Sequence, residues 1–249
     1  GEVSVPPGKL RVAFTTGSLF GKGTHPEAKA AAESAARLLA DLGHEVEEGR
    51  PSFDKEGLVR AYLVQVAAGV AAGIEDMARW VGRKPSAAAF EPTTWFLYQV
   101  GRTLSALELQ QARDAAQTAG RSLARFFSRY DILVTPTLAY PPVRLGALAL
   151  KPIERAALAA LRAVPVGAAL RAILAQLADQ SLEMTPNTQL FNQTGQPAIS
   201  LPLHQTPEGL PVGVQFAARY AEEALLVRVA AQIEEARPWK DRVPKVVAA

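Results

Sequence analysis

Serine and histidine are the residue types in this sequence that could support nucleophilic catalysis, because it holds three histidines and no cysteine. The lack of cysteine excludes a disulfide framework, a thiolate metal site and a cysteine nucleophile. His204 follows the apolar segment 201–203, so Ser181 or Ser200 could pair with His204 in a serine hydrolase site. Neither serine lies in a Gly-x-Ser-x-Gly elbow. We expect His25 and His44, at the starts of a helix and a strand, to be structural.

The familiar short motifs of catalysis and nucleotide binding are absent from the sequence. It contains no Walker loop, no dinucleotide-binding glycine fingerprint and no His-Glu-x-x-His motif, so we expect no metal and no cofactor. A formal net charge of +3 over 249 residues is weak evidence for nucleic-acid binding, and we expect no nucleic-acid partner. No signal peptide is visible, and polar residues, glycines and a proline interrupt the apolar stretches 63–74 and 156–177. We therefore expect a cytoplasmic protein that does not cross a membrane.

Two loop segments could bind a polar substrate group. Thr137 follows an expected buried strand and Pro136, at the position where α/β sheets present ligand-binding residues. The alternative is that Pro136 simply ends the strand. The second segment, 191–202, places amide and hydroxyl side chains around Gly195 directly before another strand. Such a turn either offers backbone N–H groups to a ligand or is a well-bonded turn without one.

The first fifty residues predict a strand, a helix and a second strand. Residues 10–14 are a strand pattern, and Thr24 to Glu27 combine a capping hydroxyl, an early proline and a glutamate at capping-box spacing. The helix that follows ends at Gly43, and 44–48 is a short strand. A strand, helix and strand in this order predict a right-handed parallel crossover and an α/β fold.

The remaining sequence predicts long helices followed by a hairpin. A helix covers 54–81, and a capping box at Ser105 to Glu108 opens another that runs to about residue 130. Strands are expected at 131–135, 197–203 and 212–217, with a hairpin turn at Glu208-Gly209 and a last helix over 222–236. The segment 153–179 is either a lid over an acyl group or an amphipathic surface helix pair. No linker interrupts the chain, so we expect one domain.

Several of these segments together carry a family resemblance. The strand 131–137, the stretch 191–202, the run 209–215 and the ending 222–239 resemble the C-terminal part of amidase signature enzymes, and 6–13 with 43–46 resembles the start of their second half. The resemblance is to bacterial amidases of the 6-aminohexanoate cyclic dimer hydrolase type. It implies a mixed β-sheet covered by helices. In that fold, 1–249 is one domain with a strand–helix–strand unit at 1–50, a helical substrate-side region at 54–130, and the remaining strands and helices at 131–249.

The resemblance implies hydrolysis of carboxylic amides, or esters, through a serine acyl-enzyme without metal or cofactor. In the family a lysine acts through a second serine on a cis peptide bond, and backbone amides of a Gly/Ser-rich loop hold the oxyanion. That lysine and that loop lie in the family's N-terminal half, and no such loop occurs here. The resemblance therefore assigns no catalytic residue to this chain. A half-sheet should expose an edge that an N-terminal half or a second copy covers.

By resemblance, this chain supplies a wall of the substrate pocket for a small-molecule amide or ester. Four polar residues are expected to face that pocket: Thr137, Thr185, Asn187 and Asn192. Three residues of the central helices, Glu91, Trp95 and Tyr98, are expected to fix substrate choice, although helical spacing equally fits both aromatic side chains to a core.

Three hypotheses for function follow. The first is the C-terminal portion of an amide-bond hydrolase that lacks its own catalytic triad. The second is a stand-alone esterase or amidase with a site improvised from Ser200 and His204. The third is a non-catalytic binding module on the amidase scaffold.

Overall fold

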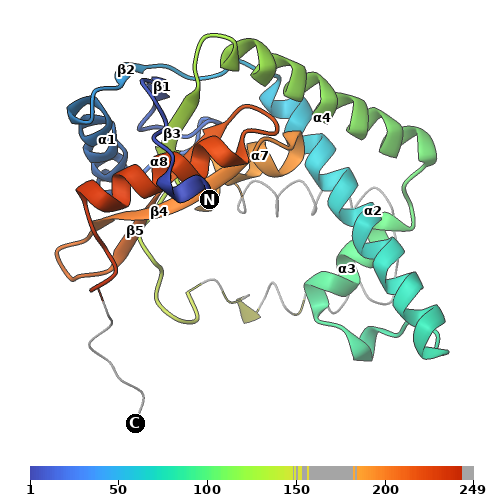
Figure 1. The fold of residues 1–249 in the computed structure, drawn as a ribbon. Coiled ribbons are helices and arrows are strands. Elements are labelled where there is room, and N and C mark those ends of the chain that lie inside the picture. The colour runs from blue at the N-terminus through green and yellow to red at the C-terminus, as the bar shows by residue number, and fades with distance from the viewer. Residues whose placement is uncertain (148, 150, 153–155, 157–181, 183, 243–249) are drawn as a thin grey trace. The chain divides into compact units, whose positions relative to one another are not determined.

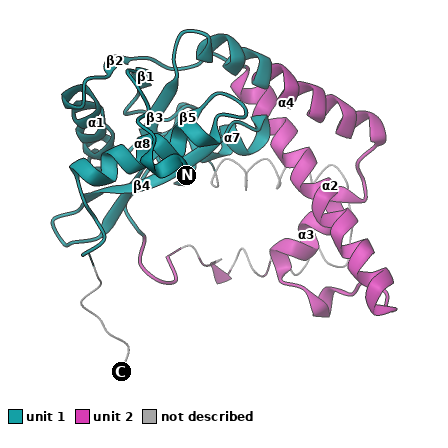
Figure 2. Ribbon diagram, viewed as in Figure 1, with its two compact units in different colours: residues 1–53, 120–142, 182–249 teal, residues 54–119, 143–181 magenta. Residues whose placement is uncertain are grey.

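A computed structural model of the chain describes residues 1–147, 149, 151–152, 156, 182 and 184–242 (Figure 1). The chain divides into two compact units (Figure 2). Unit 1 comprises residues 1–53, 120–142 and 182–249, and unit 2 comprises residues 54–119 and 143–181. We describe each unit by itself. Whether the two units fold together as one domain over 1–249, as the sequence suggests, stays a prediction.

Unit 1 is built on a five-stranded mixed sheet of order β2-β1-β3-β5-β4. Its central strand β3 is buried at all five positions, as the apolar run after Asp131 predicts. β1 runs parallel to β2 and β3, whereas β3 with β5 and β5 with β4 pair antiparallel, which confirms the parallel crossover and the hairpin. The strands are β1 (Arg11–Phe14), β2 (Glu45–Glu48), β3 (Ile132–Pro136), β4 (Ala198–Gln205) and β5 (Pro211–Ala218).

Two helices, α1 (Pro26–Asp41) and α8 (Glu223–Ala236), bury their apolar stripes in one core with this sheet (Figure 1). Leu39 of α1 and Ile233 of α8 are both fully buried in that core, which also holds Phe216 of β5. A short 3-10 helix, η1 (Glu2–Ser4), precedes β1. Burial of this apolar surface is the main stabilising contribution in unit 1. The packed sheet in turn positions the loops that follow its strands.

The start of α1 differs from the sequence expectation. His25, and not Thr24, is the N-cap, because its Nδ1 accepts a hydrogen bond from the backbone N–H of Glu27 at 3.2 Å. The Thr24 hydroxyl is buried without a partner among the described residues. His44 is 6% exposed and accepts from the Leu10 N–H through Nδ1. The structural roles expected for both histidines are confirmed.

The segment before β4 also differs from the expectation. The turn expected around Gly195 is the end of a helix, α7 (Thr188–Thr194), and Gly195 adopts a left-handed backbone with φ of 81° as its C-cap. Glycine adopts this conformation without steric cost, which explains why the helix ends there. Asn192 therefore lies on a helix rather than in a loop.

Unit 2 consists of helices among its described residues. α2 (Lys55–Val81) starts at the Asp54 N-cap, and the short helices η2 (Ala87–Ala89) and α3 (Pro92–Gly101) follow. α4 (Ala106–Phe127) starts at the predicted capping box, where the Ser105 hydroxyl accepts from the Glu108 N–H and the Glu108 carboxylate accepts from the Ser105 N–H. The last residues of α4 belong to unit 1. The lid or helix pair predicted at 153–179 lies outside the described residues, apart from residue 156.

Helix α2 is long and apolar enough to span a membrane, judged by length and composition alone, with a mean hydropathy of 1.5. Gln65 and Gly69 interrupt its apolar run but not the helix, which continues through both as the periodicity over 54–81 predicts. A third of the apolar window is buried inside the protein, through residues such as Leu58 and Ile74. Core helices of water-soluble proteins pass the same test, so this property assigns no membrane role.

Candidate functional site

The carboxyl ends of β1 and β3 lie at the same edge of the sheet, because the two strands are parallel neighbours. The chain leaves β1 at Thr15, whose N–H donates to the Val134 carbonyl at 3.0 Å. It leaves β3 at Pro136 and Thr137. In α/β sheets this edge is where ligands usually bind. The predicted site residues Thr137, Thr185 and Asn187 all lie on the segments that meet here.

Asn187 joins the two loops at this edge. Its side chain is fully buried, its Oδ1 accepts from the Leu19 N–H at 2.9 Å, and its Nδ2 donates to the Pro136 carbonyl at 2.8 Å. Both hydrogen bonds satisfy buried backbone groups. Leaving such a group without a partner would cost folding free energy. Asn187 was expected to face the pocket. In the structure it holds the loop after β1 against the end of β3, and a contact with substrate stays a prediction.

The loop after β1 is also shaped by a buried hydroxyl. Ser18 is 6% exposed, and its Oγ accepts from the N–H groups of Phe20 at 3.1 Å and Lys22 at 3.0 Å. Farther along the edge, the Ala139 N–H donates to the Met184 carbonyl at 3.1 Å. The loop after β1, the segment after β3 and the segment before α7 are therefore one hydrogen-bonded assembly.

Thr137 and Ser200 form a pair of hydroxyls at this edge. Their Oγ atoms lie 2.7 Å apart, with Thr137 just past β3 and Ser200 on β4. Gly213 of β5 lies between them in the sheet, and a Cβ at that position would stand 2.5 Å from the Ser200 Oγ and 3.0 Å from the Thr137 Oγ1. The pair exists because residue 213 has no side chain. Ser200 is exposed, so the pair can donate to, or accept from, a polar ligand group.

The other two polar residues predicted for the pocket lie nearby in sequence but are bonded differently. The Thr185 hydroxyl accepts from the Gln189 Nε2 at 3.3 Å, one turn into α7. Asn192 is exposed on the same helix. That either side chain contacts a substrate stays a prediction.

Ser200 and His204 are not hydrogen-bonded to each other. The His204 Nε2 lies 2.6 Å from the Glu27 Oε2 of α1, whereas Ser200 bonds to Thr137. Four residues of extended strand separate their Cα atoms by about 13 Å, and the β4–β5 register shifts between Leu201 and His204. Ser181, the other serine considered, lies outside the described residues.

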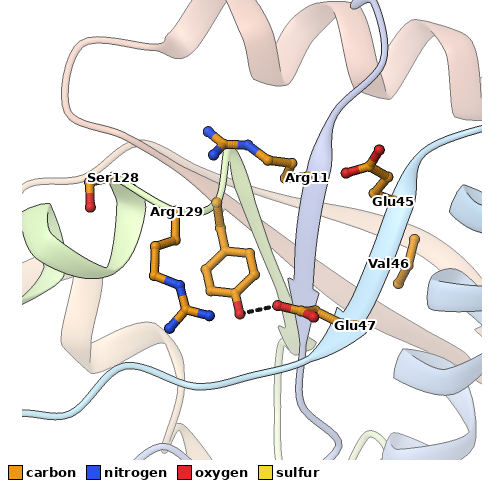
Figure 3. Close-up of a pocket in the computed structure, with 7 residues that line it drawn as sticks. Arg11, Glu45, Val46, Glu47, Ser128 and Arg129 are labelled. Atoms are coloured by element: carbon orange, nitrogen blue, oxygen red, sulfur yellow. Dashed lines mark hydrogen bonds between the residues drawn. The ribbon is translucent and has the colours of Figure 1, made fainter.

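A pocket of unit 1 lies beside β2, at the amino ends of the parallel strands (Figure 3). Its volume is about 350 Å³, and the Tyr130 hydroxyl donates to Glu47 within it. That hydrogen bond, together with burial, raises the pKa of Tyr130 above its usual value. Arg129 lies over the Tyr130 ring, 5.4 Å from its centroid. Ligand sites of α/β sheets favour the opposite edge, so we do not assign this pocket to the substrate.

Unit 2 has a cavity of its own, of about 720 Å³, and Trp95 and Tyr98 line it. Tyr98 is 3% exposed and its hydroxyl donates to the Glu75 Oε1 at 2.6 Å, while its ring centroid lies 4.8 Å from that of Trp95. Both aromatic residues also pack in an apolar cluster with Ile74. Each side chain therefore lines the cavity and also belongs to a core, the two locations that its sequence position allowed. Glu91, the third residue predicted there, is the exposed N-cap of α3 and does not line the cavity.

Sequence reasoning missed several residues that shape these sites. Gly213 is one, and the signal for it was an isolated glycine inside an expected strand, which marks a close approach. Arg102 is another, since it follows Tyr98 by one helical turn and its guanidinium carbon lies 5.6 Å from the Tyr98 ring centroid. Among the residues that the structure describes, no group of three or more His, Cys, Asp or Glu side chains could hold a metal ion.

Comparison with known proteins identifies the family. The sequence profile of the Amidase family matches residues 2–227. This chain belongs to that family. It is 32% identical over 248 residues to the 6-aminohexanoate-cyclic-dimer hydrolase of Pseudomonas sp. (strain NK87), covering 98% of this chain and 48% of the relative. It is also 32% identical over 225 residues to the lipoamidase of Enterococcus faecalis, covering 90% of this chain and 31% of that protein.

Solved structures agree with the fold of this amidase-family chain. A structure of 6-aminohexanoate cyclic dimer hydrolase matches with a TM-score of 0.77 and 30% identity, over 98% of this chain and 48% of that one. A bacterial aryl acylamidase of the amidase signature family matches with a TM-score of 0.70 at 16% identity, which supports the fold alone. The expected amidase signature resemblance and the α/β mixed-sheet fold are confirmed. The chain spans about half the length of the 6-aminohexanoate-cyclic-dimer hydrolases that it matches and about a third of the lipoamidase.

Proposed function

We propose that this chain acts as the C-terminal half of an amide-bond hydrolase and provides one wall of its substrate pocket. The proposal rests on how much of each sequence is aligned. The alignment with a cyclic-amide hydrolase covers 98% of this chain but only 48% of that enzyme. The substrate class is a small carboxylic amide or ester. The chemistry of bond cleavage then depends on the other half of the enzyme.

The reaction proposed for the complete enzyme is acyl transfer to serine. A serine oxygen attacks the amide carbonyl, the amine leaves, and water hydrolyses the resulting ester to the carboxylic acid. A lysine, acting through a second serine, accepts and returns the proton, and backbone N–H groups stabilise the oxyanion. By family resemblance these groups belong to the amino-terminal half, and we assign none of them to this chain.

The contribution of this half is to position polar groups next to that chemistry. Asn187 fixes the loop after β1 to the end of β3, and Gly213 leaves room for the Thr137–Ser200 pair. Two adjacent hydroxyls can accept from an amide N–H and donate to a carbonyl at the same time. Such groups orient a substrate, and orientation lowers the barrier of a bond-forming step.

A stand-alone serine esterase is less well supported. Its serine, Ser200, bonds to Thr137, and its histidine, His204, bonds to Glu27. A serine nucleophile needs its base within hydrogen-bonding reach.

A split-enzyme assay tests the proposal. The 249-residue chain is expressed alone and together with the amino-terminal half of the Pseudomonas 6-aminohexanoate-cyclic-dimer hydrolase, and the amine released from cyclic dimer is measured. We expect no hydrolysis by either half alone and measurable hydrolysis by the pair. Thr137→Val, which removes one hydroxyl, should lower kcat/KM of the pair, whereas Asp41→Asn on an exposed helix end should not. Hydrolysis by the chain alone, or a folded and co-purified pair without turnover, would contradict the proposal.

A further inference from the structure

We infer that the cavity of unit 2 is a binding site for a small organic carboxylate with a flat apolar body. The site stands on unit 2 alone and does not depend on the proposed hydrolase function. Its volume of about 720 Å³ lies within the range of small-molecule sites. It is lined by Glu75, Lys84, Pro85, Trp95, Tyr98, Gln99, Arg102 and Thr103.

Two aromatic side chains line this cavity. The rings of Trp95 and Tyr98 lie 4.8 Å apart between centroids, and the Phe90 ring stacks on that of Trp95 at 6.1 Å. Tyr98 is held in place by burial and by its hydrogen bond to Glu75. A flat apolar ligand body gains contact area with such rings at little cost in side-chain entropy, because the rings are already ordered.

The charged groups of the cavity favour an anion. Lys84 and Arg102 contribute two positive charges, against one carboxylate, Glu75. Glu75 already accepts the hydrogen bond of Tyr98, whereas neither cation pairs with a carboxylate of a described residue. A ligand carboxylate would satisfy this local excess of positive charge, and a guanidinium binds a carboxylate through two parallel hydrogen bonds.

A buried donor gives a second, independent indication. The indole Nε1 of Trp95 is buried and has no acceptor among the described residues. An unpaired buried donor destabilises a protein, and Trp N–H groups usually find a partner. Trp95 lines the cavity, so this unpaired N–H belongs to a residue of the cavity wall. The side chains that line the cavity therefore supply donors to an acceptor-rich ligand.

Benzoate is the probe for this site, with benzamide and benzylammonium as uncharged and cationic analogues. The readout is the indole ¹⁵N–¹H resonances of Trp80, Trp95 and Trp239 in the 249-residue chain, with the Trp95 signal assigned from Trp95→Phe. We expect benzoate to shift the Trp95 resonance in a saturable manner, with the other two unchanged. Benzamide should bind more weakly and benzylammonium not at all. No saturable shift, or an equal response to benzylammonium, would overturn the inference.

Charge-neutral variants locate the site. Lys84→Gln and Arg102→Gln should each weaken benzoate binding by about five-fold, since each removes an exposed cation, and an exposed ion pair contributes up to about a factor of this size. Arg83→Gln is the matched control, because Arg83 is exposed and next to Lys84 but does not line the cavity. Circular dichroism confirms that each variant keeps its helices. An equal loss in the Arg83 variant would show a nonspecific charge effect and overturn the assignment.

Discussion

The hydroxyl oxygens of Thr137 and Ser200 lie 2.7 Å apart, although 63 residues separate them in sequence. β3 and β4 do not pair with each other; β5 lies between them and contributes Gly213 at the level of the hydroxyls. The pair bridges across β5 because residue 213 has no Cβ. The glycine in β5 is therefore needed for the polar surface that Thr137 after β3 and Ser200 of β4 form together.

Gly213→Ala should break this arrangement and destabilise the chain by about 1–3 kcal/mol, the usual cost of forcing a methyl group into filled space. The new Cβ would meet the Ser200 Oγ first, at 2.5 Å. Adding Ser200→Ala should therefore recover part of the loss. Urea unfolding of the two single variants and the double variant measures the coupling. Strict additivity of the two changes would refute the contact.

Asn187→Ala should destabilise unit 1 by about 2–4 kcal/mol, because it leaves the buried Leu19 N–H and Pro136 carbonyl without their partner. Hydrogen exchange at Leu19 should become faster than at Val12 in the strand core. Asn192→Ala is the matched control on an exposed position of α7, and should change stability by less than about 0.5 kcal/mol. Equal losses of stability at both positions would show that Asn187 does not stabilise the fold by joining Leu19 to Pro136.

Local patterns predicted much of the fold. The Ser105–Glu108 capping box, the buried strand after Asp131 and the hairpin at Gly209 are determined by neighbours in the sequence, and the structure has all three. The cap of α1 was assigned to Thr24 because a hydroxyl is the commoner N-cap. His25 takes that position instead, since its ring nitrogen is equally able to accept the Glu27 N–H.

Glycine substitutions should separate close packing from helix propensity in unit 2. Gly101→Ala should destabilise by about 1–3 kcal/mol, because its Cβ would collide with the backbone carbonyl of Ala67 and the side chain of Ala71 where α3 packs on α2. Gly73→Ala should stabilise by about 0.5–1 kcal/mol, because nothing lies near its Cβ and alanine favours a helix. Thermal unfolding measures both. The account of this contact fails if the two substitutions shift Tm in the same direction.

The stability contributed by Asp131 should depend on pH. Burial alone raises its pKa, but the hydrogen bonds and charge of Arg11 and the charge of Arg219 together hold it below the ordinary value near 3.8. A carboxyl group with a lowered folded-state pKa stabilises the fold above its unfolded-state pKa. That contribution is lost as the pH falls through the folded-state pKa.

The stability difference between the native chain and Asp131→Asn should therefore be largest near neutral pH and shrink toward about pH 2. Urea unfolding across that range measures it. Arg219→Gln, which removes one of the two cations, should retain part of the pH dependence because Arg11 remains. A difference that stays constant with pH would contradict this assignment.

The candidate site was predictable only in part, because its contacts join distant segments. Thr137 was identified from its place after a buried strand, and it does lie at the carboxyl edge of the sheet. Nothing local to Asn187 indicates that it is buried against Leu19, 168 residues away. Ser200 and His204, close in sequence, bond to Thr137 and Glu27 instead, since a strand carries residues four apart away from each other.

The central claim is that this chain shapes a hydrolase pocket without holding its nucleophile. The most direct test is labelling with a fluorophosphonate probe, followed by mass spectrometry of the labelled peptide. The account predicts no label on any serine of the 249-residue chain, Ser200 included, and a label on the amino-terminal half of the Pseudomonas relative once the two halves are combined. Stoichiometric labelling of a serine in this chain, abolished by His204→Ala, would contradict it.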